Sequence, residues 1–211
     1  MADWVTISSL ATAGGTLVLA AATFASTRSA NRSARVAERS LLSAQRPVLI
    51  PSREDDPVER IPFIEGYRVT LHGHGGVIEV DEGRIYMAIG LRNAGAGLAV
   101  LHGWLAHAYV EGVADERPQP EDFHRQVRDL YIPAGDAGFW QGAIRDPADD
   151  HYEALASAAG DGSRVLVDLM YGDHEGGQRA IARFSVTPED EGSGRTANVV
   201  RYWNIDREDP R

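Results

Sequence analysis

The amino-acid sequence predicts a mainly β protein, an antiparallel β-sandwich preceded by one long N-terminal transmembrane and stem helix. Three observations predict this fold: a charge-free segment, an arginine-rich segment with helical spacing, and apolar residues with a period of two after Pro47. The expected parts of the chain are an anchor and stem over 1–46 with the span at about 4–27, a β domain over 47–206, and a loose tail over 207–211.

Composition excludes several classes of function. The 211 residues include no cysteine, so disulfide scaffolds, thiolate zinc sites and cysteine nucleophiles are excluded. All 21 positively charged side chains are arginine, and the absence of lysine excludes a phosphate loop of the G-x-x-x-x-G-K type. The net charge of −10 argues against nucleic acid as a partner, because phosphates require a basic surface. We expect no cofactor.

The charge is unevenly distributed along the chain. Residues 1–46 carry five arginines against two acids, a net charge of +3, whereas residues 47–211 carry 16 arginines against 29 acids, a net charge of −13. An acidic domain on a short basic stem is typical of a membrane-proximal protein, with the stem near anionic lipid and the domain in solvent.

Residues 4–27 contain no charged side chain. A helix of this length reaches roughly 36 Å, enough for a hydrocarbon core of about 30 Å. A cleaved signal peptide would carry positive charge before the apolar run, whereas only Asp3 precedes it. A buried core helix is rarely this long and free of charge, and hydroxyl side chains on every side argue against an interfacial helix. We therefore expect one membrane-spanning helix, with Trp4 at its boundary.

The charges that flank the span predict its orientation. Four arginines follow the span closely and none precedes it, so the C-terminal side should stay in the cytoplasm. The expected location is the cell membrane, single-pass, with the β domain cytoplasmic and the N-terminus outside.

The stem over 28–45 should continue the helix. At 100° per residue four arginines form one narrow stripe, and small apolar side chains form the opposite face. The stripe consists of Arg28, Arg32, Arg35 and Arg39, and the opposite face of Ala30, Ala34, Ala37, Leu41 and Ala44. The stripe would bind anionic lipid or a protein partner, and the small face would allow self-association with a second stem helix. The alternative is a solvated helix whose arginines only fix the orientation of the chain in the membrane. Pro47 should end the helix.

Alternation of apolar and polar residues predicts strands after Pro47. The expected strands are 67–71, 77–80, 85–91, 98–110 with a bulge at Gly103, 165–171, 180–186 and 198–205. Hairpins are expected at 72–76 and 172–178, and the strand at 85–91 should be half-buried. One further helix should begin at Asp146 and Pro147 and end before Gly160. Seven or so strands with few helices between them favour a sandwich over βαβ units.

Four segments carry a resemblance to a known group of proteins: LRNAGAGLAVLHGW (91–104), DLYIPAGDAGFWQGAIRD (129–146), YGDHEGGQRAIARFSV (171–186) and RYWNID (201–206). They resemble uncharacterised actinobacterial single-pass membrane proteins, in which an anchor and an arginine-rich stem precede an immunoglobulin-like β-sandwich. The pattern R-N-x-G-x-G-x-A at 92–99 also recurs in bacterial immunoglobulin-like domains. The resemblance implies an immunoglobulin-like fold and no activity that could be transferred.

Catalytic and ligand-binding motifs are mostly missing. The sequence contains no G-x-S-x-G elbow, dinucleotide fingerprint or metalloprotease helix. His72 and His74 are weak metal candidates, because histidines two apart on a strand share a face, and the alternative is that they are solvent-facing turn residues. Trp104, Trp140 and Trp203 form a candidate binding surface, with core packing as the alternative.

These observations favour a membrane-anchored cytoplasmic module that acts by protein binding or scaffolding, without catalysis. Its expected partners are the lipid bilayer and an unidentified protein, but no nucleic acid. Two alternatives stay open: a metal-dependent enzyme whose site is built from loop histidines and acids, and a surface-exposed adhesion or wall-associated domain.

Overall fold

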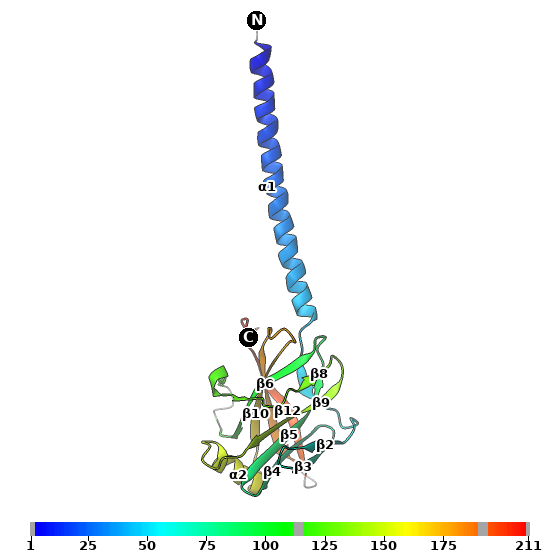
Figure 1. Cartoon of the computed structure of the whole chain (residues 1–211), viewed down its shortest axis with the longest axis vertical. Coiled ribbons are helices and arrows are strands. Elements are labelled where there is room, and N and C mark those ends of the chain that lie inside the picture. Colours follow the sequence, from blue (N-terminus) through cyan, green and yellow to red (C-terminus); the bar gives the residue numbers. More distant parts are fainter. Residues whose placement is uncertain (1–2, 112–115, 190–193, 210–211) are drawn as a thin grey trace. The chain divides into compact units, whose positions relative to one another are not determined.

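A computed structural model of the protein describes residues 3–111, 116–189 and 194–209 (Figure 1). The chain divides into two compact units, Met1–Ala44 and Gln45–Arg211. The first unit contains one long helix, and the second contains an antiparallel β-sheet.

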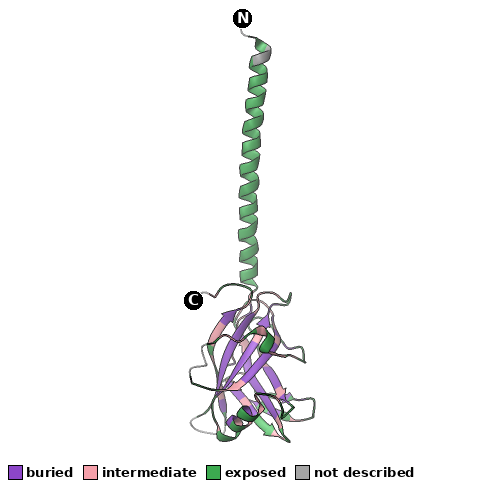
Figure 2. Ribbon diagram, turned by 90° about the vertical axis from the view of Figure 1, so that its left-hand side faces the viewer, coloured by how far each residue is buried: buried purple, intermediate pink, exposed green. Residues whose placement is uncertain are grey.

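The first unit is the α-helix α1 (Trp4–Ala44), which continues from the apolar segment into the stem without a break. Every described side chain of α1 is exposed, and these residues are green in Figure 2. The helix is long and apolar enough over Ile7–Ala44 to cross a membrane or to be a signal sequence. It ends three residues before Pro47, as the sequence predicted, because the residue before a proline is disfavoured in the α conformation.

The hydroxyl side chains that dilute the apolar segment find partners within α1. Thr12, Thr16, Thr23 and Thr27 each donate their hydroxyl to the carbonyl four residues earlier, at 2.8–2.9 Å. This back-bonding satisfies polar groups that an apolar environment would otherwise leave without a partner.

Ten strands of the second unit form one antiparallel sheet in the order β1-β5-β4-β12-β11-β10-β6-β7, with β8 paired to β6 and β9 paired to β5. The strands are β1 (Leu49–Pro51), β4 (Gly75–Asp81), β5 (Arg84–Asn93), β6 (Ala99–Ala108), β7 (His124–Arg125), β8 (Tyr131–Ile132), β9 (Ala137–Ile144), β10 (Val165–Gly172), β11 (Ala180–Pro188) and β12 (Arg195–Asn204). The predicted antiparallel β domain is confirmed, but these ten strands form one large sheet, because a short ladder of two residue pairs joins β12 to β4.

One hydrophobic core is shared by strands from distant positions in this sheet. It contains Met87 and Ile89 of β5, Trp140 of β9, Leu169 of β10 and Phe184 of β11, all of them fully buried. A flat sheet could not bring these side chains into one cluster, so the sheet curls around its own inner face (Figure 2).

Strand β5 is buried on both faces. A two-stranded hairpin, β2 (Glu59–Pro62) and β3 (Arg68–Leu71), covers its outer face and forms a second cluster with it. Tyr86 of β5 packs there against Phe63 and Tyr67, with ring centroids 4.8 and 4.4 Å away. The prediction of a half-buried strand over 85–91 was therefore wrong, because alternation could not show that the second face has a cover of its own.

The predicted hairpin through residues 72–76 was also wrong. The strands on either side exist, but β3 pairs with β2, whereas β4 pairs with β5 and β12. The chain crosses between the two sheets at Gly73, where a Cβ would lie 2.1 Å from the carbonyl oxygen of Arg53. Glycine is required at this close approach of two backbone segments.

Other local predictions are confirmed. Strands β10 and β11 form an antiparallel hairpin around residues 172–178. Strand β6 has its irregularity next to Gly103, because Leu101 and Gly103 face consecutive residues of β10 and leave His102 as the extra residue.

The second helix lies later than the sequence predicted. Asp146 accepts a hydrogen bond from the amide of Ala148 in a turn, and α2 (Tyr152–Asp161) begins only after a further turn. Gly160 lies inside α2, and Gly162 ends it in the left-handed conformation with φ of 75°. A short 3-10 helix, η1 (Pro120–Asp122), precedes β7.

A buried ion pair joins the two central strands. The guanidinium of Arg183 on β11 donates two hydrogen bonds of 2.7 Å to the carboxylate of Asp168 on β10. The ring of Trp203 lies 4.9 Å from the Arg183 guanidinium carbon. Beyond β12, the described part of the tail is held to Asn204, which donates hydrogen bonds to Asp209 and Glu208.

Candidate functional site

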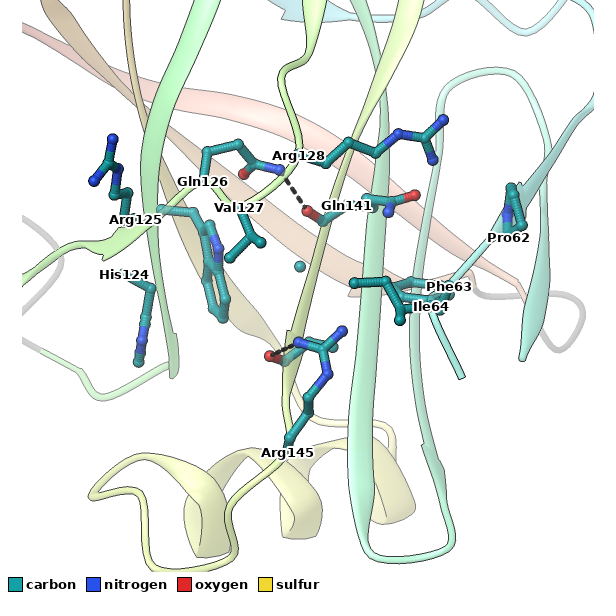
Figure 3. A pocket seen from close by; sticks show the side chains of 13 residues that line it. Pro62, Phe63, Ile64, His124, Arg125, Gln126, Val127, Arg128, Gln141 and Arg145 are labelled. Carbon is teal, nitrogen blue, oxygen red and sulfur yellow. Dashed lines mark hydrogen bonds between the residues drawn. The ribbon is translucent and has the colours of Figure 1, made fainter. Parts of the chain in front are cut away.

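The two ends of the curled sheet approach each other and leave a pocket between them. One end is β9, whose single partner strand among the described residues is β5, and the other is formed by β6 with the short strands β7 and β8. The pocket encloses about 580 Å³, which is within the usual range for ligand sites. Its lining comes from four parts of the chain: 62–64, Trp104, 124–128, and 141–143 with Arg145. We call this pocket the seam pocket (Figure 3).

Aromatic contacts hold the back of the seam pocket together. Trp104 of β6 lies edge-on to Trp140 of β9, with ring centroids 5.5 Å apart. His124 of β7 stacks on the other side of Trp104 at 4.5 Å and lies 3.6 Å from a carboxylate oxygen of Asp149. Gly142 permits this packing, since a Cβ there would lie 2.5 Å from the Trp140 ring.

The two walls are bridged by one side-chain hydrogen bond. The Nε2 amide of Gln126 donates to the backbone carbonyl of Gln141 on β9 at 3.3 Å, as Figure 3 shows. The side-chain Oε1 atoms of both glutamines are buried and have no hydrogen-bond partner among the described residues. Gln141 is more than nine-tenths buried, so its amide oxygen cannot turn to bulk solvent.

The outer edge of β9 carries no strand partner among the described residues. In its antiparallel ladder with β5, alternate residues point their backbone groups away from β5. Gln141 and Ala143 are such residues, because side chains of Gln126 and Arg145 donate to their carbonyls. Neither amide N–H has an acceptor in the described part of the chain, so two unused backbone donors border the pocket, beside carbonyls that accept only from side chains.

Three arginines give the rim a positive charge. Arg145 pairs with Glu65 in a partly exposed contact, and this hydrogen bond holds the pKa of Glu65 below its usual value. Arg125 and Arg128 are exposed and have no ion-pair partner within the described residues. None of the described residues that line the pocket is acidic, although the chain as a whole is acidic.

Apolar side chains also stand at the mouth of the seam pocket. Val127 is 83% exposed and Ile64 is 81% exposed, and the largely buried Phe63 lies beside Ile64. These exposed side chains add apolar contact area for a ligand beside the basic rim.

The three candidate tryptophans are buried, with 0–7% of each residue exposed. Trp104 and Trp140 lie next to each other, and Trp104 alone lines the seam pocket. Trp203 instead lies against the guanidinium groups of Arg183 and Arg201. The three rings therefore do not gather into one binding surface.

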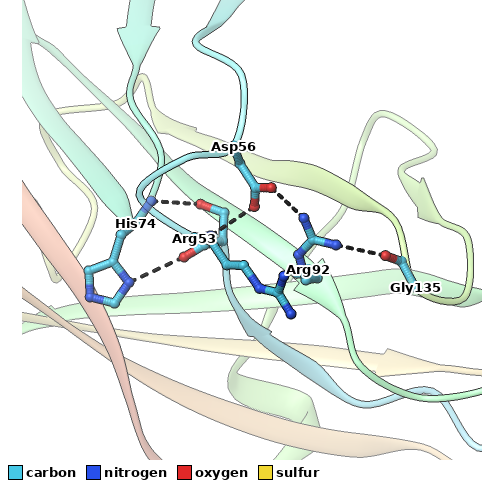
Figure 4. Close-up of polar contacts among 6 residues, drawn as sticks. Arg53, Asp56, His74, Arg92 and Gly135 are labelled. Atoms are coloured by element: carbon cyan, nitrogen blue, oxygen red, sulfur yellow. Dashed lines mark hydrogen bonds and ion pairs between the residues drawn. The ribbon is translucent and has the colours of Figure 1, made fainter.

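The two candidate metal ligands, His72 and His74, are not surrounded by carboxylate groups of the described residues. The backbone N–H of His74 donates to the hydroxyl of Ser52, and its ring Nδ1 lies 3.2 Å from the Ser52 carbonyl. His72 is exposed two residues before it. The nearby carboxylate of Asp56 pairs with Arg92, whose guanidinium also donates to the carbonyl of Gly135 (Figure 4). Across the described ranges, no three His, Asp or Glu side chains form a group that could hold a metal ion.

The stem arginines Arg28, Arg32, Arg35 and Arg39 all lie on α1 and are exposed. No ion-pair partner is found for them among the described residues, so their charge is available to an external partner.

Sequence reasoning missed the seam pocket. A local signal existed in residues 124–128, HRQVR, which carry two arginines and a histidine without an acid inside an acidic domain. The contributions of Gln141 and Arg145 had no such signal, because they reach the pocket only through the pairing of β9 with β5.

No family model matches the sequence, and no curated protein and no solved structure matches it.

Proposed function

We propose that the protein is a single-pass membrane-anchored module whose β unit works in the cytoplasm by binding another protein, without catalysis. The observation that carries the proposal is the seam pocket. Among the described residues it combines a strand edge without a partner strand, apolar side chains, and two arginines without an ion pair, Arg125 and Arg128. The described residues that line it include no carboxylate and no hydroxyl side chain, so among them there is neither a hydroxyl nucleophile nor a carboxylate acid or base. Such a lining favours binding over chemistry.

The anchor part of the proposal is supported by α1. Its apolar side chains are all exposed where they are described, and its threonine hydroxyls are satisfied within the helix. Lipid is the environment that accepts such a surface. The arginines on only one side of the apolar segment favour a cytoplasmic β unit, and their stripe would lie against anionic headgroups.

The relation to actinobacterial single-pass membrane proteins is part of the same proposal. It rests on the four segments that resemble them and on the order of the two units, anchor helix first and β unit second. The immunoglobulin-like arrangement is likewise proposed, from the antiparallel pairing and the shared core of the β unit.

Site-specific photo-crosslinking in a native host tests the binding function. A benzophenone amino acid replaces Val127 at the pocket mouth, and the matched control replaces Val200, which is half-exposed on β12. We expect discrete crosslinked species from position 127 that are absent from position 200. The absence of protein adducts at position 127 would count against a protein-binding function.

Reporter fusions test the orientation. A fluorescent protein fused after Arg211 should fluoresce, and a secreted phosphatase fused there should be inactive. The reverse pattern would place the β unit outside the cell and favour a surface domain.

A further inference from the structure

We propose that the seam pocket captures an extended acidic peptide segment of the partner, which adds as a strand to the outer edge of β9. This inference rests on the proposed binding function and names the chemistry of the bound segment. Strand addition supplies affinity through backbone hydrogen bonds and specificity through pockets for alternate side chains.

The backbone edge is the first argument for a peptide. The N–H groups of Gln141 and Ala143 point away from β5 and have no acceptor among the described residues, and their carbonyls are reached only by side chains. An extended peptide offers both donors and acceptors at the spacing of such an edge. A small anion offers acceptors alone.

The second argument comes from two side-chain amide oxygens that have no hydrogen-bond donor among the described residues. The Oε1 atoms of Gln126 and Gln141 are buried in the walls of the pocket without a donor in the described part of the chain. A buried acceptor without a partner is destabilising, and a ligand whose N–H groups reached these oxygens would relieve that cost. Peptide N–H groups meet this need, whereas a carboxylate or phosphate would be repelled by these oxygens.

Charge and hydrophobicity specify the side chains of the peptide. Arg125 and Arg128 have no ion-pair partner among the described residues, and the lining includes no acid. Val127 and Ile64 expose apolar surface at the mouth. Side chains of a strand alternate between its two faces, so a segment with acidic and apolar residues in alternation would meet both surfaces.

Selection from a displayed library of random heptapeptides tests the inference, with the full chain held in nanodiscs of neutral phosphatidylcholine. The neutral lipid keeps anionic headgroups away from the stem arginines. We expect enrichment of acidic sequences with alternating apolar residues. The most enriched sequence is then synthesised, and its affinity for the full chain is measured by fluorescence anisotropy.

Two changes should each lower the affinity of this peptide for the protein at least about tenfold. One brings like charges together, and the other removes backbone hydrogen bonds. The first is the protein variant Arg125→Glu/Arg128→Glu, and its matched control is Arg60→Glu/Arg68→Glu, an equal change of charge on the exposed side of the β2–β3 hairpin. The second is N-methylation of alternate peptide residues, which removes backbone donors and cannot affect folding of the protein.

Three outcomes would overturn the inference. No enrichment of peptides would do so, and so would an enriched peptide that binds both charge variants equally, since it would bind outside the seam pocket. The third outcome is binding without peptide N–H groups. If a fully N-methylated peptide or decanoate, a simple acyl anion, binds the protein and loses as much affinity on substitution of Arg125 and Arg128 as the selected peptide does, the pocket binds amphipathic anions instead. Protein adducts from the crosslinking experiment would still support the binding function in each of these cases.

Discussion

Helix α1 and strand β5 are both rich in apolar residues, and their environments are opposite. Every described side chain of α1 is exposed, whereas β5 buries all of its residues except Arg84 and Arg92. The strand finds its partners within the chain, in the shared core on one face and in the β2–β3 hairpin on the other. The described side chains of the helix have no such cover within their own unit, and the proposed anchor role gives this apolar surface a lipid environment.

The largest effect is expected from charge in the middle of α1. The double substitution Leu17→Arg/Leu19→Arg should release the full chain from the membrane, because each central arginine costs about 2.5–3.5 kcal/mol of insertion free energy. Extraction of membranes with alkaline carbonate measures the release. The matched control is Leu41→Arg/Leu42→Arg, which places the same charges in the stem. Equal retention of both variants would show that α1 does not span the bilayer.

The buried ion pair of the β unit should give the next largest effect. Asp168→Asn leaves the charge of Arg183 without its buried carboxylate and should lower the free energy of unfolding by about 3–5 kcal/mol. Glu65→Gln, which breaks the partly exposed pair with Arg145, should cost at most about 1 kcal/mol. Denaturant unfolding of the full chain in detergent, followed by tryptophan fluorescence, compares the two. A cost below that of Glu65→Gln would contradict the central position of the Asp168–Arg183 pair.

A truncation within β5 sharpens the same contrast between helix and strand. Ile89→Ala should lower the free energy of unfolding of the β unit by about 2–5 kcal/mol, because it leaves a cavity in the shared core. Leu19→Ala in α1 removes as many carbon atoms and should leave unfolding of the β unit unchanged, since Leu19 is exposed. Similar losses from both substitutions would mean that the helix contributes to the core.

The difference between local and long-range contacts also explains which parts of the fold could be predicted. The β10–β11 hairpin was predictable, because both strands and the turn between them are continuous in sequence. The partner of β3 was not, because alternation identifies a strand but not the sheet to which it belongs. The start of α2 was misplaced because Asp146 and Asp149 each accept a hydrogen bond from the amide two residues later, which forms turns instead of a helical cap.

The seam pocket illustrates the same limit at the level of the site. Residues 124–128 carry an unusual run of basic residues that sequence inspection could have noticed. Gln141 belongs to the pocket only because β9 ends the sheet and leaves one edge without a strand. The three tryptophans of the β unit were predicted to form a binding surface because they are large aromatic residues. Of these three, Trp104 alone lines the pocket, because all three rings are buried in the fold.

The smallest effect is expected from pH, and it concerns His107, a partly buried residue of β6. Burial lowers the pKa of His107, Arg183 and His151 lower it further, and Asp168 opposes them. The unfolded chain therefore takes up a proton at a higher pH than the folded chain. The neutral ring of His107 therefore contributes its full stabilisation of the fold above the ordinary pKa of about 6.5. This contribution is lost as the pH falls below that value toward the lower pKa of the folded state.

Melting of a Trp4→Phe variant of the full chain, followed by tryptophan fluorescence, measures this effect in the β unit alone. The melting temperature should be constant just above pH 6.5 and should fall below it. Burial also lowers the pKa of His102 on the same strand, so the control is the double substitution His102→Gln/His107→Gln. This control should flatten the profile between about pH 6.5 and pH 5, where acids of ordinary pKa have not yet begun to be protonated to a large extent. An unchanged slope in the double variant would assign the pH dependence to other groups.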